Sequence, residues 1–441
     1  MRVVIAPDKF KGSLTAPGVA RHLEAGLHAA ARGGGQISNL EVLRIPVADG
    51  GEGTLDAAVG SGFTRRSALV NGPTGVPVRA EYAVRGHVAV IEMAAASGLA
   101  VLPGGSAGGS VGGAAGSVGG AAGAPDSASA RGASSLGTGQ LIRAALDAGC
   151  RQIILGVGGS ANTDGGAGVL QGLGARLLDA DGRELPLGGA VLARLAWIDF
   201  SGFDPRLEGA RFVLASDVDN PLLGPSGAAR IFGPQKGATP ADVQLLDEAL
   251  AHFVQVLAAE IGPRALRAAD APGAGAAGGV GYAAIAALAA TRRPGIDVVL
   301  EFSRLAAQLA GADLVITGEG SLDEQSLLGK TPMGVARAAE RAGVPVVAVC
   351  GRTTLTPEQQ KISGFRRVYP LTSLEARVEM CITEAGPLLE QLGQQIGAEL
   401  PDLVPGTVQI CTVQTGTVET GTVQTGTAPA ESVPTKESLN V

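Results

Sequence analysis

Glycine-rich or acidic loops follow apolar or helical runs at five places along this 441-residue chain, and they limit its possible folds more than any other feature. The loops cover residues 48–54, 156–166, 216–221, 272–279 and 317–323, and all but the fourth contain carboxylates. Because glycine lacks a Cβ, such loops let backbone N–H groups approach phosphate oxygens. Carboxylates beside them can bind Mg²⁺ or accept a proton. The pattern indicates an enzyme that binds a polyphosphate.

Strand-like and helix-like segments alternate between these loops. Short apolar runs typical of strands cover 3–6, 40–47, 67–70, 76–84, 87–91, 152–157, 211–215, 312–316 and 344–349. Helix-like segments cover 16–31, 55–59, 134–149, 167–173, 239–261, 280–290 and 333–342. This alternation predicts an α/β protein with a parallel sheet, whose ligands bind at the carboxyl ends of the strands.

Composition excludes several classes of protein. Hydrophobic residues make up 45% of the chain and aromatic residues 3%, so the cores must consist of Ala, Val, Leu and Ile. The net charge of −7 and the lack of a dense basic block argue against nucleic-acid binding. No apolar segment is long enough to span a membrane, and the first strand is too short for a signal peptide. We therefore expect a cytoplasmic protein with no membrane partner.

Side chains with metal or disulfide chemistry are scattered along the sequence. The four cysteines, Cys150, Cys350, Cys381 and Cys411, are far apart and predict neither a disulfide framework nor a zinc site. All four histidines lie outside the five loops, at positions 22, 28, 87 and 252. Catalysis must then depend on Asp, Glu, Lys and backbone groups.

Two segments have low sequence complexity. Residues 103–130 are a Gly/Ala/Ser tract, which we expect to be a flexible surface insertion. After about residue 398, the repeats Thr-Val-Gln-Thr-Gly and Thr-Val-Glu-Thr-Gly have a period of five, which reverses the exposed face with each repeat. We expect a disordered tail there, with β-aggregation as the alternative.

Gly273-x-Gly275-x-x-Gly278 precedes a predicted helix, but no strand-like segment comes directly before it, as the dinucleotide-binding fingerprint requires. Anion binding at the helix N-terminus fits better, and close helix packing is the alternative. Gly329-Lys330-Thr331 resembles a phosphate-binding loop, but Glu324 stands where that motif needs its first glycine. Lys330 remains either a point charge for a phosphate or an ordinary surface lysine.

Polar side chains follow several predicted strands. Asp217, Asp219 and Asn220 could bind Mg²⁺ or orient a hydroxyl, or each Asp could simply be a turn or cap residue, and Glu319 and Asp323 present the same choice. The loop after the first strand carries Asp8, Lys11 and Ser13, which could hold a small anionic substrate.

These residues belong to longer motifs through which the chain strongly resembles the class I glycerate kinase family. The motifs are APDKFKGSL at 6–14, PVADGGEGT at 46–54, IEMAAASGL at 91–99, GTGQ at 137–140, the glycine loop at 156–168, ASDVDNPL at 215–222, FGPQKGA at 232–238 and the segment 317–330. The resemblance covers about residues 1–102 and 132–395. The 103–130 insertion, the repeat tail and Leu136, where an aromatic is common, depart from the family pattern but remove no carboxylate.

The resemblance implies a flavodoxin/Rossmann-like parallel-sheet domain with a second α/β domain inserted in it and an active site in the cleft between them. We place the first domain at residues 1–94 and 290–396, the inserted domain at 95–289 and the tail at 397–441. The resemblance also implies ATP-dependent phosphorylation of D-glycerate with Mg²⁺. It favours 2-phosphoglycerate over 3-phosphoglycerate as the product.

The expected roles of individual residues rest on this resemblance together with the loop chemistry. Asp217, or Asp49 as second choice, accepts the substrate hydroxyl proton, while Lys11 and Lys236 offset charge on the moving phosphoryl group. The remaining expected sites are Asp8, Ser13, Glu52, Asn220 and Lys236 for the substrate, Gly158, Gly159, Ser160, Thr163, Gly273, Gly275, Gly278 and Lys330 for the nucleotide, and Glu319 and Asp323 for the metal.

Two other functions stay open at this point. A non-catalytic sensor on the same fold would bind ATP and glycerate without releasing ADP. A nicotinamide dehydrogenase is suggested only by the isolated glycine fingerprint at 273–278. Monomer and homodimer are both compatible with the sequence.

Overall fold

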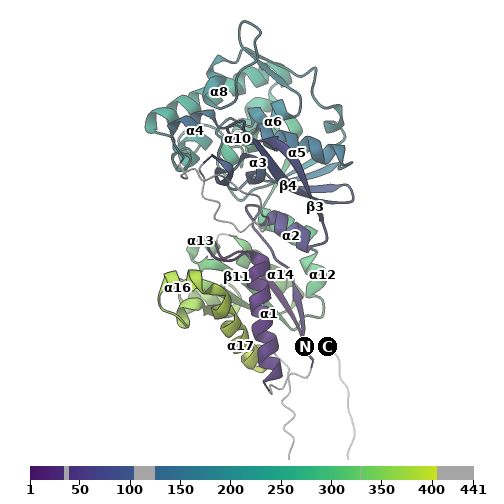
Figure 1. The fold of residues 1–441 in the computed structure, drawn as a ribbon, viewed down its shortest axis with the longest axis vertical. Coiled ribbons are helices and arrows are strands. Elements are labelled where there is room, and N and C mark those ends of the chain that lie inside the picture. Colours follow the sequence, from purple (N-terminus) through teal and green to yellow (C-terminus); the bar gives the residue numbers. More distant parts are fainter. Residues whose placement is uncertain (34–38, 104–124, 328, 405–441) are drawn as a thin grey trace, which may run out of the picture. The chain divides into compact units, whose positions relative to one another are not determined.

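A computed structural model describes residues 1–33, 39–103, 125–327 and 329–404 (Figure 1). Its helices are α1 Ala16–Arg32, α2 Thr54–Gly60, α3 Ala94–Ser97, α4 Ser127–Gly132, α5 Leu136–Asp147, α6 Ala167–Gly172, α7 Ala228–Phe232, α8 Pro240–Ile261, α9 Arg264–Ala269, α10 Ala276–Leu288, α11 Gly295–Phe302, α12 Leu305–Leu309, α13 Glu324–Leu327, α14 Thr331–Ala342, α15 Pro357–Ile362, α16 Val378–Thr383 and α17 Ala385–Leu403. Among the described residues no helix is both long and apolar enough to cross a membrane.

The first sheet has five strands in the order β13-β12-β11-β1-β2, and each neighbouring pair is parallel. Its strands are β1 Arg2–Pro7, β2 Glu41–Arg44, β11 Leu314–Leu322, β12 Val346–Thr353 and β13 Phe365–Pro370. Numbered by their order along the chain and read from the β2 edge, the five strands lie in the order 2-1-3-4-5, which is the flavodoxin-like arrangement. The prediction of a flavodoxin/Rossmann-like parallel sheet is confirmed.

Helices cover both faces of this sheet because its strands are apolar on both sides. Val3 and Ile5 of β1 pack with α1 and α17 in one core, while Val4 and Ala6 pack with α2, α11, α12 and α14 in another. Figure 1 shows α1 and α17 side by side, where Gly26 and Gly393 let the two backbones approach closely.

The second sheet has six strands in the order β10-β9-β6-β5-β4-β3. Its strands are β3 Thr64–Asn71, β4 Pro77–Arg85, β5 Val88–Glu92, β6 Gln152–Gly156, β9 Arg211–Ala215 and β10 Thr291–Arg293. The pairs from β5 to β10 are parallel, whereas β3, β4 and β5 form an antiparallel meander. A small antiparallel pair, β7 Arg176–Leu178 with β8 Trp197–Asp199, lies outside it.

Several boundaries differ from the sequence-based expectations. Strands β3–β5 fall inside the expected 1–94 segment but pair in the six-stranded sheet, so strand pairing would move that boundary to between α2 and β3. The domain division itself stays a prediction. The fifth loop, 317–323, is mostly strand: β11 continues to Leu322 because Glu319 and Ser321 pair with Cys350 and Arg352 of β12.

Parts of the two low-complexity segments belong to described helices. Asp126 caps α4 through a reciprocal pair of hydrogen bonds with Ser129, so a helix lies partly inside the expected 103–130 insertion. Helix α17 extends to Leu403, because Ile396, Leu400 and Leu403 are buried against β1 and α1. Residues 104–124 and 405–441, with Cys411, lie outside the described residues. Cys150, Cys350 and Cys381 are buried free thiols.

A buried carboxylate holds the second glycine loop in place. Asp164 accepts hydrogen bonds from the side chains of Ser135 and Asn162 and from the backbone N–H groups of Ser135, Gly166 and Gly168. This network joins the loop after β6 to the starts of α5 and α6.

Replacing Asp164 by Ala should therefore lower the free energy of unfolding by about 3 kcal/mol, because several buried donors lose one charged acceptor. Asp181→Ala, at an exposed turn, is the matched control and should change it by less than about 0.5 kcal/mol. Urea denaturation monitored by circular dichroism measures both. Equal effects of the two substitutions would contradict the role of Asp164.

Candidate active site

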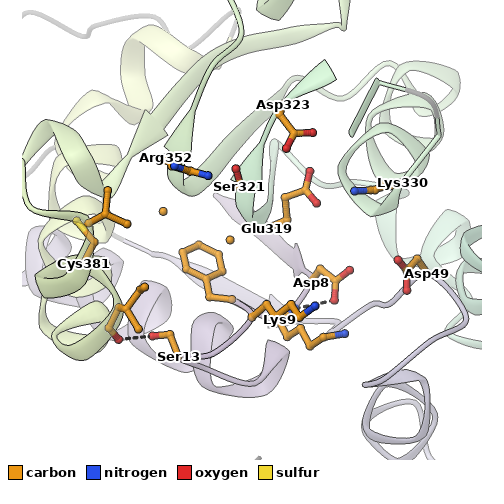
Figure 2. A pocket seen from close by; sticks show the side chains of 16 residues that line it. Asp8, Lys9, Ser13, Asp49, Glu319, Ser321, Asp323, Lys330, Arg352 and Cys381 are labelled. Carbon is orange, nitrogen blue, oxygen red and sulfur yellow. Dashed lines mark hydrogen bonds between the residues drawn. The ribbon is translucent and has the colours of Figure 1, made fainter. Parts of the chain in front are cut away.

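A cavity of about 450 Å³ opens at the carboxyl ends of β1, β11 and β12; we call it the switch-point pocket. Asp8 and Lys11 follow β1, and Glu319 and Ser321 are among the last residues of the neighbouring strand β11. In a flavodoxin-like sheet the strand order reverses between these two strands, and ligands bind in the crevice there. Figure 2 shows Asp8, Asp49, Glu319, Asp323 and Lys330 on one side of the pocket, with Ser13 and Cys381 on the other.

A second cavity, of about 580 Å³, is lined by Gly158, Gly159 and Ser160 after β6, by Asp217 after β9 and by the 49–52 loop after β2; we call it the glycine-loop pocket. Both cavities include Lys9, Lys11, Asp49 and Lys330 in their walls. The two pockets are therefore adjoining parts of one site. No histidine lines either pocket among the described residues, as the sequence predicted.

Backbone contacts between glycines join the 49–52 loop to the six-stranded sheet. A Cβ on Gly156 would lie 2.5 Å from the carbonyl oxygen of Gly50, and a Cβ on Gly295 would overlap the carbonyl oxygen of Asp49. Gly50 has a φ of +87°, in the region that favours glycine. These positions exclude any side chain, and the resulting close approach brings Asp49 and Asp217 into the same cavity.

Asp217 lies at the end of β9 and reaches solvent in the glycine-loop pocket. Its Oδ1 accepts a hydrogen bond of 2.8 Å from the backbone N–H of Gly295. Desolvation of the carboxyl and the negative charge of Asp49 raise the pKa of Asp217 to about 6, although the Gly295 hydrogen bond opposes this shift. A carboxylate with a pKa in this range can act as a general base near neutral pH.

Asp8 is buried at the end of β1 and its oxygens already have partners. The hydroxyl of Thr331 donates to Oδ2 at 2.7 Å, and the backbone N–H of Lys9 donates to Oδ1 at 2.7 Å. Burial and the charge of Asp49 raise the pKa of Asp8 to about 6. Asp49 thus influences a carboxylate in each pocket.

Glu319 presents an unused acceptor to the switch-point pocket. Its Oε1 is buried and has no hydrogen-bond partner among the described residues. Desolvation raises its pKa to about 7, while the Ser326 hydroxyl and the charge of Lys330 oppose the shift. A buried carboxylate oxygen without a donor is the kind of ligand that Mg²⁺ prefers, so Glu319 fits the expected metal.

Asp323 lines the same pocket but also serves as a turn residue. Its Oδ1 accepts hydrogen bonds from the backbone N–H groups of Gln325 and Ser326 at the start of α13. In the described ranges, no group of three or more His, Cys, Asp or Glu side chains is arranged to hold a metal ion. The expected metal role of Asp323 stays a prediction.

Lys236 is buried rather than facing the pocket, with only 1% of its surface exposed. Its Nζ donates to Ser160 Oγ at 2.9 Å and to the carbonyl oxygen of Asn162 at 2.5 Å. Burial lowers its pKa to about 7, and the charge of Asp164 opposes that shift. We expected Lys236 to contact the substrate. Its side chain instead hydrogen-bonds to Ser160 from the buried side of the glycine loop. The sequence could not predict this contact, because it does not show in which direction a lysine side chain points.

The glycine fingerprint at 273–278 is explained by packing. A Cβ on Gly273 would lie 2.6 Å from Arg292 Cδ, while Gly275 and Gly278 pack against the carbonyl oxygens of Pro221 and Asn162. None of these three glycines lines either pocket. The element before them is helix α9, so the strand required for dinucleotide binding is absent from this part of the described chain. Their expected phosphate role remains untested.

Two other expected ligand residues also lie outside the pocket walls. Asn220 donates from Nδ2 to the carbonyl oxygen of Ser226 in its own loop. Thr163 is fully buried, and its Oγ1 has no partner among the described residues. By contrast, Ser13 lines the switch-point pocket and Glu52 lines the glycine-loop pocket, and their substrate roles stay predictions. Ser13 donates to the carbonyl oxygen of Ile382.

The sequence reasoning missed two residues that organise the site. Gly295 donates to Asp217, but no signal in the sequence connects positions 78 residues apart. Glu92 accepts a hydrogen bond of 2.5 Å from the backbone N–H of Leu55 in the first turn of α2, and burial raises its pKa to about 7. Its position at the end of a predicted strand was a signal that could have identified it.

Comparisons with known proteins identify the family of the chain. The profile of the glycerate kinase family matches residues 3–109 and 111–400. A glycerate kinase from Halalkalibacterium halodurans is 42% identical over 397 residues, covering 89% of this chain and 97% of that protein. A glycerate 2-kinase from Escherichia coli is 42% identical over 359 residues, covering 80% of this chain and 86% of that protein.

A solved structure also matches. The crystal structure of a putative glycerate kinase 2 from Salmonella typhimurium has a TM-score of 0.74 and 39% sequence identity, and covers 91% of this chain and 98% of its own. Each of these relatives therefore covers at least 80% of this chain.

The raised pKa of Glu319 leads to a prediction about stability. Such a carboxyl stabilises the fold below its ordinary pKa of 4.5 and loses that contribution as the pH rises through about 7. In EDTA at pH 8, Glu319→Gln should be more stable than the wild type by about 1–2 kcal/mol, and at pH 5 the difference should be clearly smaller, because the folded carboxyl is then protonated. Urea midpoints at both pH values measure it. The exposed Glu324→Gln is the control, and a Glu319→Gln effect equal at both pH values would contradict the assignment.

Proposed function

Because the chain belongs to the glycerate kinase family, and is therefore a kinase, we propose that it transfers the γ-phosphoryl group of ATP to D-glycerate, with 2-phosphoglycerate as the product. The observation that best supports this proposal is the meeting of Asp49, Asp217 and three lysines in the walls of one continuous site. Phosphoryl transfer requires mainly positioning and charge stabilisation, which this arrangement can supply without a covalent nucleophile.

In this mechanism Asp217 accepts the proton of the attacking glycerate hydroxyl. Its raised pKa keeps it basic enough to take the proton and largely ionised at neutral pH. The hydrogen bond from Gly295 fixes the carboxylate, leaving its other oxygen directed to the substrate. Asp49 is the second candidate because it lines the same pocket.

Cations offset the charge on the phosphoryl group during transfer. Lys11 is exposed, and none of the hydrogen bonds or ion pairs of the described residues involves its side chain. Lys330 lines both pockets beside Glu319. Glu319 would hold Mg²⁺, which would supply further charge stabilisation to the phosphoryl group when bound.

The second glycine loop contributes backbone groups. Gly158, Gly159 and Ser160 line the pocket next to the 49–52 loop, where backbone N–H groups can approach an oxyanion. Lys236 holds Ser160 from the buried side, so we assign it a positioning role. Closure of the site would exclude water, which competes with glycerate for the phosphoryl group.

Replacing Asp217 by Asn should reduce kcat at least about 100-fold, because the amide cannot accept the proton but can still accept the Gly295 hydrogen bond. Asp219→Asn is the matched control; Asp219 is exposed, pairs with Arg292 and should be dispensable for turnover. A coupled ADP-release assay with D-glycerate measures both, and an unchanged rate in Asp217→Asn would eliminate it as the base.

Phosphorus NMR of the product of the same assay identifies which hydroxyl is phosphorylated. The proposal predicts 2-phosphoglycerate; 3-phosphoglycerate would overturn that assignment but not the kinase activity. A wild-type chain that binds ATP and glycerate without releasing ADP would instead be the non-catalytic sensor.

A further inference from the structure

The wall of the switch-point pocket changes character from one side to the other. The lining includes Asp8, Glu319, Asp323 and Lys330, and also Phe10 together with Val378, Cys381 and Ile382 of α16. Figure 2 shows Cys381 on the opposite side of the pocket from Asp323 and Lys330, with Arg352 between Cys381 and Ser321. Glycerate is a small polar anion and would gain little from contact with these apolar side chains. The pocket suits a planar, largely apolar group attached to a strongly charged one.

Two of these apolar side chains are exposed among the described residues. Val378 is 42% exposed and Ile382 is 43% exposed, although both line a cavity. The hydroxyl of Ser13 donates to the carbonyl oxygen of Ile382 at 2.6 Å, which ties α16 to the loop after β1. The apolar wall therefore has a fixed position relative to the end of β1.

Positive charge is concentrated where the two pockets meet. The chain contains only six lysines, and three of them, Lys9, Lys11 and Lys330, line both cavities. Lys9 is held there by hydrogen bonding to the carbonyl oxygen of Glu52 at 2.5 Å. A molecule that extends from the apolar residues to Asp217 would therefore contact three cations, which suits a chain of negatively charged phosphates.

We propose that the switch-point pocket binds the adenine and ribose of ATP, with the base against Phe10, Val378 and Ile382. The triphosphate then passes Lys9, Lys11 and Lys330 toward Gly158–Ser160, and glycerate occupies the glycine-loop pocket beside Asp217. This inference rests on the proposed function and deepens it by assigning a separate pocket to each substrate. It also assigns to α16 a nucleotide contact that the sequence motifs did not suggest.

Equilibrium binding of mant-ADP with Mg²⁺ to the full chain, measured by fluorescence without glycerate, tests this assignment. The double variant Val378→Asn/Ile382→Asn should raise the Kd at least about 10-fold, because both substitutions remove apolar contacts to the base. Leu374→Asn is the matched control, since Leu374 is 42% exposed nearby in sequence but lines neither pocket. Equal Kd values for wild type, double variant and control would overturn the proposal.

Inorganic tripolyphosphate separates recognition of the base from recognition of the phosphates. It should displace mant-ADP from the wild type, and its own Kd should be unchanged in the double variant because it has no base. An equal loss of tripolyphosphate affinity would overturn the proposal, since α16 would then act on the phosphates or on the whole pocket. These readouts need no turnover, so a chain that binds the nucleotide as described yet releases no ADP would refute the kinase mechanism while leaving this assignment intact.

Discussion

The site depends on the close backbone contact of the 49–52 loop with the last residue of β6 and the first residue of α11. Gly156 and Gly295 leave room for the carbonyl oxygens of Gly50 and Asp49, and no residue with a side chain fits at these two positions without moving the loop. The 49–52 loop follows β2 of the five-stranded sheet, and Gly156 is the last residue of β6 in the six-stranded sheet. This contact therefore brings polar residues that follow strands of both sheets into one site. The glycines at these points are there for packing, and the catalytic geometry results from it.

One consequence is electrostatic. Asp49 lies in the walls of both pockets and raises the pKa of Asp8 on one side and of Asp217 on the other. Three acidic groups this close repel one another unless cations or a proton offset their charge. The lysines at the junction and the free oxygen of Glu319 make the site suited to a negatively charged nucleotide accompanied by Mg²⁺.

The sequence predicted the fold well because strand and helix periods are local properties. It placed β9 at 211–215 and predicted an α/β protein with a parallel sheet, while the motif resemblance implied the flavodoxin/Rossmann-like domain and led to the correct family. It also placed Asp49, Asp217, Lys11 and Glu319 at strand ends, and the structure brings these residues to adjoining pockets.

Side-chain direction and long-range packing could not be predicted from the sequence. Lys236 points into the protein, the glycines at 273–278 pack against carbonyl groups, and Gly295 reaches Asp217 across the sheet. Each of these outcomes depends on contacts between segments distant in sequence.

The pH dependence of kcat/KM for glycerate tests the central claim most directly. If Asp217, held by Gly295 and influenced by Asp49, is the base, kcat/KM rises with pH through about 6 in the wild type, and this limb is absent from the residual activity of Asp217→Asn. A wild-type profile without that limb, or the same limb at about pH 6 in the variant, would contradict the account.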